Sequence, residues 1–142
     1  MNYFYIEECP TQAARALCDK HVVKMILETA QMLSTAHRLT ESPQADFVYN
    51  PTHANHPSTK WLRSSQIAYK HGLQHLRALF AEYTHRYGKR HATERLLPYL
   101  AQVPDALPDL PFVEPPQCMY DECRGLDTIA AYRDYYRVRE NE

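Results

Sequence analysis

The sequence predicts an all-α fold: a compact single-domain bundle over residues 1–142, with two long helices and a proline-rich loop before the last helix. Apolar residues recur mostly at helical intervals of three and four. The chain has only 3 glycines, and β-branched residues rarely alternate with polar ones as they would in strands. With 142 residues and a 44% hydrophobic composition, the chain is long enough to bury one core.

Turn and capping residues divide the first half into two expected helices. Residues 3–6 form a short apolar start, for which a brief strand is one interpretation. A helix over 10–17 opens on a proline, and a second over 19–39 has Asp19 as its expected N-cap. Residues 40–57 hold three prolines and two asparagines, which indicates an ordered loop.

The second half is expected to hold the other long helix, over residues 58–87, ended by Gly88. A shorter helix over 92–102 follows, and the five prolines of residues 103–124 predict extended coil on the surface. A tyrosine-rich helix over 126–137 closes the chain. The apolar line of the long helix predicts a core seam: Leu62, Tyr69, Leu73, Leu76, Phe80, Tyr83 and Tyr87.

Charge and composition limit the classes of function. The net charge of −1 argues against a grip on nucleic acid by the whole molecule. Eight Lys or Arg residues nevertheless face two acids within residues 60–95, which is compatible with a local phosphate-binding face. The chain lacks a run of about 18 apolar residues and a secretion signal, so we expect no membrane span. Its 4 cysteines are then expected to be free thiols in a cytoplasmic protein.

A polar stripe runs along the helix predicted over residues 19–39. Its members step by three and four and so share one face of an otherwise apolar helix: His21, Lys24, Glu28, Gln31, Thr35 and Arg38. One interpretation is a solvated face with an ordinary Lys24–Glu28 pair. The other is the wall of a cavity, where an imidazole, a carboxylate and an amide would serve chemistry.

The segment PTHANHP, residues 51–57, places two histidines between prolines. Rigid loop residues often form sites, but His56 or Asn55 would equally cap the following helix. His53 and His56 with His21 and Glu28 would suit a first-row metal ion. A paired ligand spacing such as HExxH is missing from the sequence, so the prediction is no metal and no cofactor.

A basic line marks the helix predicted over residues 58–87. Arg63, Lys70 and Arg77 are seven residues apart, and Trp61 lies near the start of this line. Such a line would follow a phosphate backbone, or it would simply be a solvated helix face.

With these residues in view, the chain resembles a widespread family of small phage-type proteins over most of its length. More distantly it is similar to the phage pyrimidine-dimer DNA glycosylases of the endonuclease V type, in which a histidine precedes the catalytic glutamate by seven residues on a central helix. His21 and Glu28 have that spacing, and His56 precedes another helix as a second histidine does there. The blocks that carry the resemblance are CDKHVVKMILETAQMLSTAHR at 18–38, PTHANHP at 51–57 with Trp61 and Arg63, EYTHRYGK at 82–89 and AYRDYY at 131–136.

The resemblance implies a compact all-α enzyme that flips nucleotides and cuts the glycosidic bond. In that group the initiator methionine is removed, and the exposed amine attacks the sugar C1′ with help from the glutamate. Here position 2 is Asn2, which is too large for the usual removal, so Met1 is expected to stay.

The leading hypothesis is therefore a DNA glycosylase-like enzyme that acts on a base–sugar linkage in DNA or a nucleotide. The alternatives are a metal-dependent hydrolase that uses the histidines, and a non-enzymatic phage effector that binds a host protein through residues 103–124. The catalytic candidates are Glu28, His21 and His56. The substrate-binding candidates are Lys24, Gln31, His53, Asn55, Trp61, Arg63 and Lys70.

Overall fold

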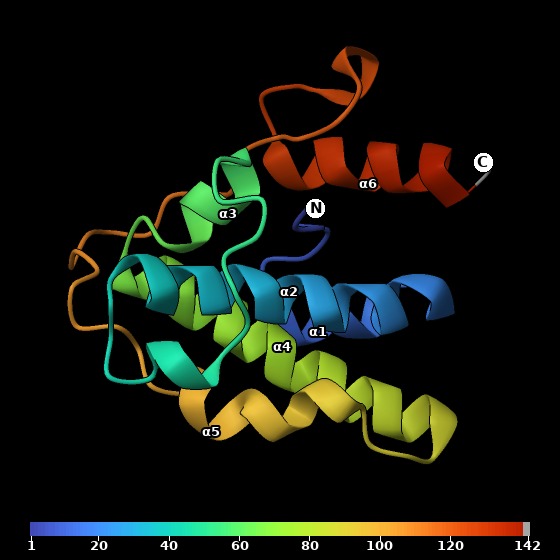
Figure 1. Ribbon diagram of the computed structural model, residues 1–142. Helices are drawn as coiled ribbons and strands as arrows, with labels where there is room; N and C mark the ends of the chain where they lie inside the picture. The colour runs from blue at the N-terminus through green and yellow to red at the C-terminus, as the bar shows by residue number, and fades with distance from the viewer. Residues whose placement is uncertain (141–142) are drawn as a thin grey trace.

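The computed structural model describes residues 1–140, and all regular structure in them is helical (Figure 1). The prediction of an all-α fold with two long helices is confirmed, because α2 has 21 residues and α4 has 22. The brief strand considered at residues 3–6 is wrong, since these residues have no regular secondary structure. In chain order the helices are α1 (Pro10–Ala16), α2 (Asp19–Leu39), α3 (Pro57–Leu62), α4 (Gln66–Tyr87), α5 (Leu97–Leu100) and α6 (Thr128–Glu140), with short 3₁₀ helices at Ala45–Phe47, Ala92–Leu96 and Asp121–Cys123.

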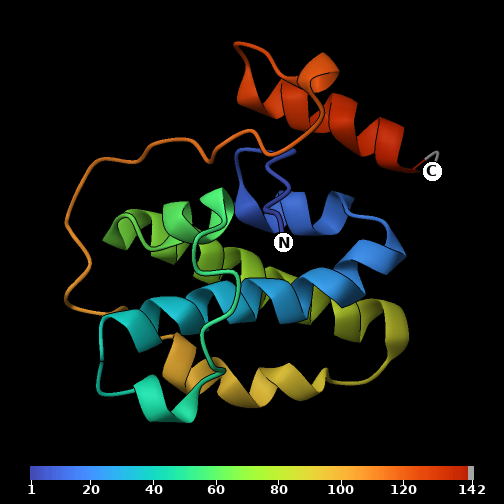
Figure 2. The ribbon, with the colours of Figure 1, turned by 45° about the horizontal axis from the view of Figure 1, so that its top comes forward.

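Helix α4 is packed against α1 and α2, and α3 lies against both long helices. Helix α6 lies apart from this stack, on the side away from α5, and the N-terminus lies between α6 and α2 in both views (Figures 1 and 2). Among residues 1–140, no helix combines the length and apolar character that crossing a bilayer requires.

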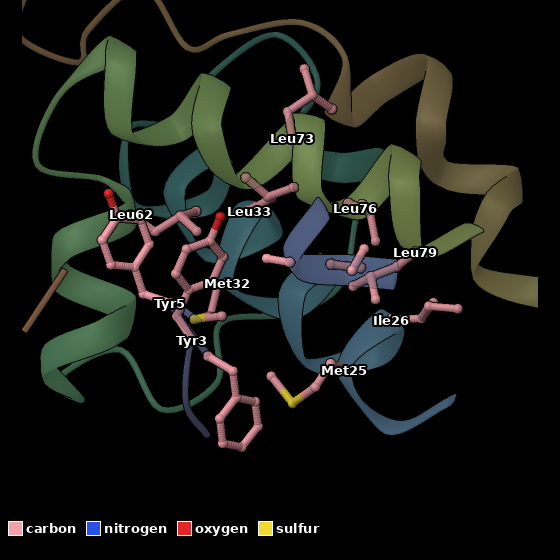
Figure 3. Close-up of a cluster of buried hydrophobic side chains, with 14 of the residues drawn as sticks. Tyr3, Tyr5, Met25, Ile26, Met32, Leu33, Leu62, Leu73, Leu76 and Leu79 are labelled. Carbon is pink, nitrogen blue, oxygen red and sulfur yellow. The ribbon is translucent and has the colours of Figure 1, made fainter. Parts of the chain in front are cut away.

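The first residues of the chain run through the core. Tyr3, Phe4, Tyr5 and Ile6 are all buried, with at most 6% of each residue exposed. Figure 3 shows Tyr3 and Tyr5 among buried side chains that come from α2, α3 and α4. Because the segment is enclosed by packing, the residue that precedes it is held in one place.

The single helix predicted over residues 58–87 is wrong, because it is broken between α3 and α4. Ser65 is extended and its hydroxyl caps α4 by accepting the N–H of Ala68 at 3.1 Å. The N–H of Gln66 donates to the carbonyl of Pro108 at 2.8 Å, so the proline-rich segment takes up a group that a continuous helix would have used. Serine side chains can form such local hydrogen bonds with the backbone, and here the bond to the distant proline-rich segment stabilises the break between the two helices.

Three smaller expectations are also corrected. Asp19 does not cap α2: Cys18 is the N-cap, and Asp19 lies in the first turn and pairs with Arg86 at 2.9 Å. The core seam ends before Tyr87, which is 41% exposed. The helix predicted over 92–102 is a 3₁₀ helix followed by the four-residue α5, since a proline follows Leu97.

Candidate active site

The N-terminal amine lies beside the central carboxylate of α2. The nitrogen of Met1 is 3.1 Å from Oε1 of Glu28, and the Glu28 side chain is 13% exposed. Glu28 is half-buried, at the boundary between the buried and the exposed faces of α2. The pair therefore joins a potential nucleophile to a potential proton acceptor at hydrogen-bonding distance.

The other oxygen of Glu28 is less engaged. Oε2 lies 3.8 Å from Nζ of Lys24, which is 50% exposed. Within the described residues this buried oxygen has no hydrogen-bond partner. Buried acceptors are usually satisfied, so Oε2 is available to a donor that a ligand would bring. The Lys24–Glu28 pair expected from the spacing is thus present, with Lys24 half exposed and Glu28 largely enclosed.

His21 is packed beneath the N-terminal segment. Its ring stacks on Phe4 with centroids 4.8 Å apart, and Nδ1 lies 3.1 Å from the hydroxyl of Tyr136. That hydroxyl also accepts the N–H of Cys18 at 2.6 Å, which ties α6 to the start of α2. Burial lowers the pKa of His21, the cations Arg139, Lys20 and Lys24 lower it further, and Glu28 opposes them. His21 is therefore neutral at pH 7 and able to orient its neighbours.

The far half of the polar stripe holds the loop that contains PTHANHP. The hydroxyl of Thr35 accepts the N–H of Thr52 at 3.2 Å. Arg38 donates to the carbonyls of Val48 and Tyr49 at 2.8 and 3.3 Å. The stripe is thus divided: Glu28 in its first half lies against the amine, and its second half positions the loop against α2.

His56 comes close to the amine through this loop. Its Nδ1 accepts the N–H of Ser58 at 3.1 Å and caps α3, as one interpretation of the segment expected. Burial lowers the pKa of His56, and the positive charges of Met1 and His53 lower it further, whereas Glu28 raises it. These mutual effects mean that His56, His53, Glu28 and the amine lie within electrostatic reach of one another. His53 itself is exposed and has a positive φ of 47°.

The remaining candidates differ in position. Gln31 is half-buried on α2, one turn beyond Glu28, and Asn55 is exposed in the loop. Trp61 is 8% exposed and donates to the carbonyl of Val113 at 2.8 Å, so it anchors the proline-rich segment. Lys70 is exposed on α4.

Arg63 ends α3 rather than continuing a basic line along α4, because the helix breaks there. Its Nη1 is buried and has no hydrogen-bond partner within the described residues, and burial lowers its pKa. Guanidinium groups bind anions such as phosphate, but this donor is itself enclosed in the described residues.

Residues 1–140 bring no three His, Cys, Asp or Glu side chains into a group that would hold a metal ion. His21 is turned to Phe4 and Tyr136, and His56 caps α3, so the histidines do not converge on one point. The geometry does not favour the metal-dependent hydrolase.

Two residues of the site have no signal in the side-chain pattern. Met1 contributes its main-chain amine, and Asn2 holds the neighbouring backbone. Only the resemblance to enzymes with an N-terminal nucleophile pointed to this end of the chain.

Comparison with known proteins agrees with the geometry. The family model described as pyrimidine dimer DNA glycosylase matches residues 1–95, which include the amine, Glu28 and the PTHANHP loop. No curated protein and no solved structure matches the chain.

Proposed function

Because the chain belongs to the pyrimidine dimer DNA glycosylase family, we propose that it cleaves a base–sugar linkage in DNA with the amine of Met1 as nucleophile and Glu28 as its acid/base partner. The observation that carries the proposal is the 3.1 Å separation between the amine and Oε1 of Glu28. The proposal takes Met1 as the first residue of the mature protein, which intact-mass measurement tests directly.

The chemistry begins with the amine in its neutral form, after its extra proton has passed to Glu28 or to water. The nitrogen lone pair attacks C1′ of the target nucleotide, and the bond between C1′ and the base breaks. The base leaves with the bonding electrons and takes up a proton. The bond between C1′ and the ring oxygen then opens, that oxygen is protonated, and an imine joins Met1 to the sugar.

Glu28 supports two stages of this sequence. As a carboxylate it stabilises the positive charge that develops at C1′ and on the nitrogen. As a proton carrier, it returns a proton to the opening sugar ring. Water then hydrolyses the imine, which frees the amine and leaves an abasic site.

The side chains around the pair supply binding. Lys24 and His53 are exposed at the edge of the site, and Arg63 is a half-buried cation at the end of α3. We assign these groups to phosphate contacts, with Gln31 and Asn55 as hydrogen-bonding partners of the nucleotide. His21 and His56 orient the site through their contacts with Phe4, Tyr136 and α3.

The proline-rich segment, on which the effector interpretation relied, is fastened to the core. Gln66 and Trp61 donate to its carbonyls at Pro108 and Val113, and Asn2 donates to that of Cys118. These contacts give the segment a structural role, so we do not propose it as a surface for a host protein.

The experiment is borohydride trapping on a duplex with one abasic site, followed by peptide mapping of the adduct. We expect a one-to-one adduct on the peptide that begins at Met1, because borohydride reduces an imine to a stable amine. Protein whose α-amine has been acetylated serves as the control and should give no adduct.

Three outcomes would refute the proposal: no adduct under conditions where the protein binds the duplex, an adduct that maps to Lys24, or equal trapping after α-amine acetylation. A parallel assay on duplexes with a pyrimidine dimer, an alkylated base or uracil identifies the base that is released.

A further inference from the structure

We infer that Asn2 is a positioning residue for the nucleophile, and that the structure is built around a retained Met1 whose side chain anchors the amine. The inference rests on the proposed function for its catalytic meaning, but the contacts that carry it are independent of any reaction.

The Met1 side chain is almost entirely enclosed. Only 1% of it is exposed, and it packs against the hydrophobic core. The residue as a whole is half-buried, so its accessible surface belongs to the main chain, where the amine is. A buried thioether with an accessible amine is the arrangement that an anchored nucleophile needs.

Asn2 fixes the next unit of backbone with both ends of its amide. Its Nδ2 donates to the carbonyl of Cys118 at 3.0 Å, and its Oδ1 accepts the N–H of Tyr3 at 2.7 Å. The hydroxyl of Tyr132 lies 3.2 Å from the same Oδ1 and 2.5 Å from the carbonyl of Pro116, so its proton is shared between them. The clamp, defined as Asn2 with Cys118 and Tyr132, therefore ties the chain start to α6 and the segment before it.

The clamp prevents the amine of Asn2 from taking the place of the Met1 amine beside Glu28. Consecutive Cα atoms are about 3.8 Å apart. If Met1 were removed, the amine would move to Asn2 and retreat by about this distance from Glu28, unless the clamp broke. A misplacement of about 1 Å is enough to cost about 100-fold in rate at an active site.

Asn2 also protects the residue it positions. Removal of an initiator methionine requires a small second residue, and asparagine is too large. One side chain thus keeps Met1 on the chain and holds its backbone. Serine or alanine at this position would fail in both respects.

The test prepares every protein from a cleavable N-terminal fusion, so that the first residue is chosen and not left to processing. The set comprises the wild type beginning at Met1, a form beginning at Asn2, and Asn2→Ala and Asn2→Asp with Met1 present. Gln74→Ala, at an exposed position on α4, is the matched control. Borohydride trapping rates and duplex affinities are measured for each, with the melting temperature as a check of folding.

We expect the form that lacks Met1 to trap about 100-fold more slowly and Asn2→Ala about tenfold more slowly, with duplex affinity unchanged. Asn2→Asp keeps the acceptor for Tyr3 and Tyr132 and loses only the donor to Cys118, so it should recover part of the rate. Equal trapping by the form without Met1, or wild-type trapping by Asn2→Ala, would overturn the inference, as would an intact mass that lacks Met1 in protein from the native gene.

A second measurement separates this inference from the proposed function. The α-amine's acetylation rate is followed by mass spectrometry in the absence of DNA. In the wild type the clamp holds the amine against Glu28, so acetylation should be slower than in Asn2→Ala. If the wild type traps no abasic site, the proposed function fails, and this comparison still decides the clamp: equal acetylation rates refute it.

Discussion

Replacing Glu28 by glutamine tests the amine–carboxylate pair with the least change in shape. Glutamine keeps the volume and one oxygen but removes the charge 3.1 Å from the amine and the proton-accepting function. General acid–base catalysis contributes about 10²–10⁴-fold, which corresponds to about 3–5 kcal/mol of activation free energy. We therefore expect the single-turnover trapping rate of Glu28→Gln to fall by about that factor.

The cost in stability should be smaller. The Glu28 side chain is 13% exposed and the amine is accessible, so the pair lies between a surface ion pair, worth about 0–1 kcal/mol, and a buried one, whose disruption costs about 3–5 kcal/mol. A loss of about 1–2 kcal/mol would lower the melting temperature by roughly 3–8 °C in a chain of this size. The variant should remain folded at 25 °C, where the assay is run.

The matched control is Glu82→Gln. Glu82 is 15% exposed and pairs with Arg86 at 2.9 Å on α4, so it has similar burial and a similar partner outside the proposed site. Its loss should lower stability and leave trapping unchanged. A Glu28→Gln rate within about threefold of the wild type would show that the carboxylate takes no part in proton transfer.

Two further predictions concern stability. Burial lowers the pKa of His37 and of His75 to about 4, so the unfolded state binds more protons than the folded state between pH 4 and 6.5. The free energy of unfolding should therefore be complete above pH 6.5 and fall by about 2 kcal/mol per histidine at pH 5. A melting temperature that stays level from pH 7 to pH 5 would contradict this. In Gly72→Ala the new Cβ would lie 2.5 Å from Cδ1 of the buried Leu62. The overpacking cost of about 1–3 kcal/mol should exceed the helix-propensity gain of about 1 kcal/mol, so the urea midpoint of unfolding should fall. A smaller effect of Gly72→Ala in a Leu62→Ala background would identify the clash as the cause, and a raised midpoint would refute it.

The helices of this chain were predictable where local periodicity decides the structure. The apolar spacing of residues 19–39 is continuous, and α2 has those bounds. The break between α3 and α4 was not predictable, because it depends on Ser65 as a cap and on a hydrogen bond from Gln66 to Pro108, more than 40 positions away in the sequence. The apolar periodicity within one helix contains no information about a hydrogen-bond partner so far away in the sequence.

The candidate site shows the same division. Spacing alone placed His21, Lys24 and Glu28 on one face of a helix, but it gave no means to distinguish a solvated stripe from a cavity. Burial of His21 depends on Tyr136 of α6, and the position of His56 depends on the bond between Thr35 and Thr52. The amine itself has no side-chain pattern, so only the resemblance to a family pointed to it.

The clamp joins the two ends of the chain, and this has a consequence during translation. Asn2 and Tyr132 are 130 positions apart, so a ribosome that adds about 5–20 residues per second synthesises the second partner about 6–26 s after the first. Throughout that interval the nascent chain carries its N-terminal amine without the contacts of the clamp. The clamp is therefore completed only when α6 has left the ribosome, and a chain that ends before Tyr132 should hold its N-terminus less firmly beside Glu28.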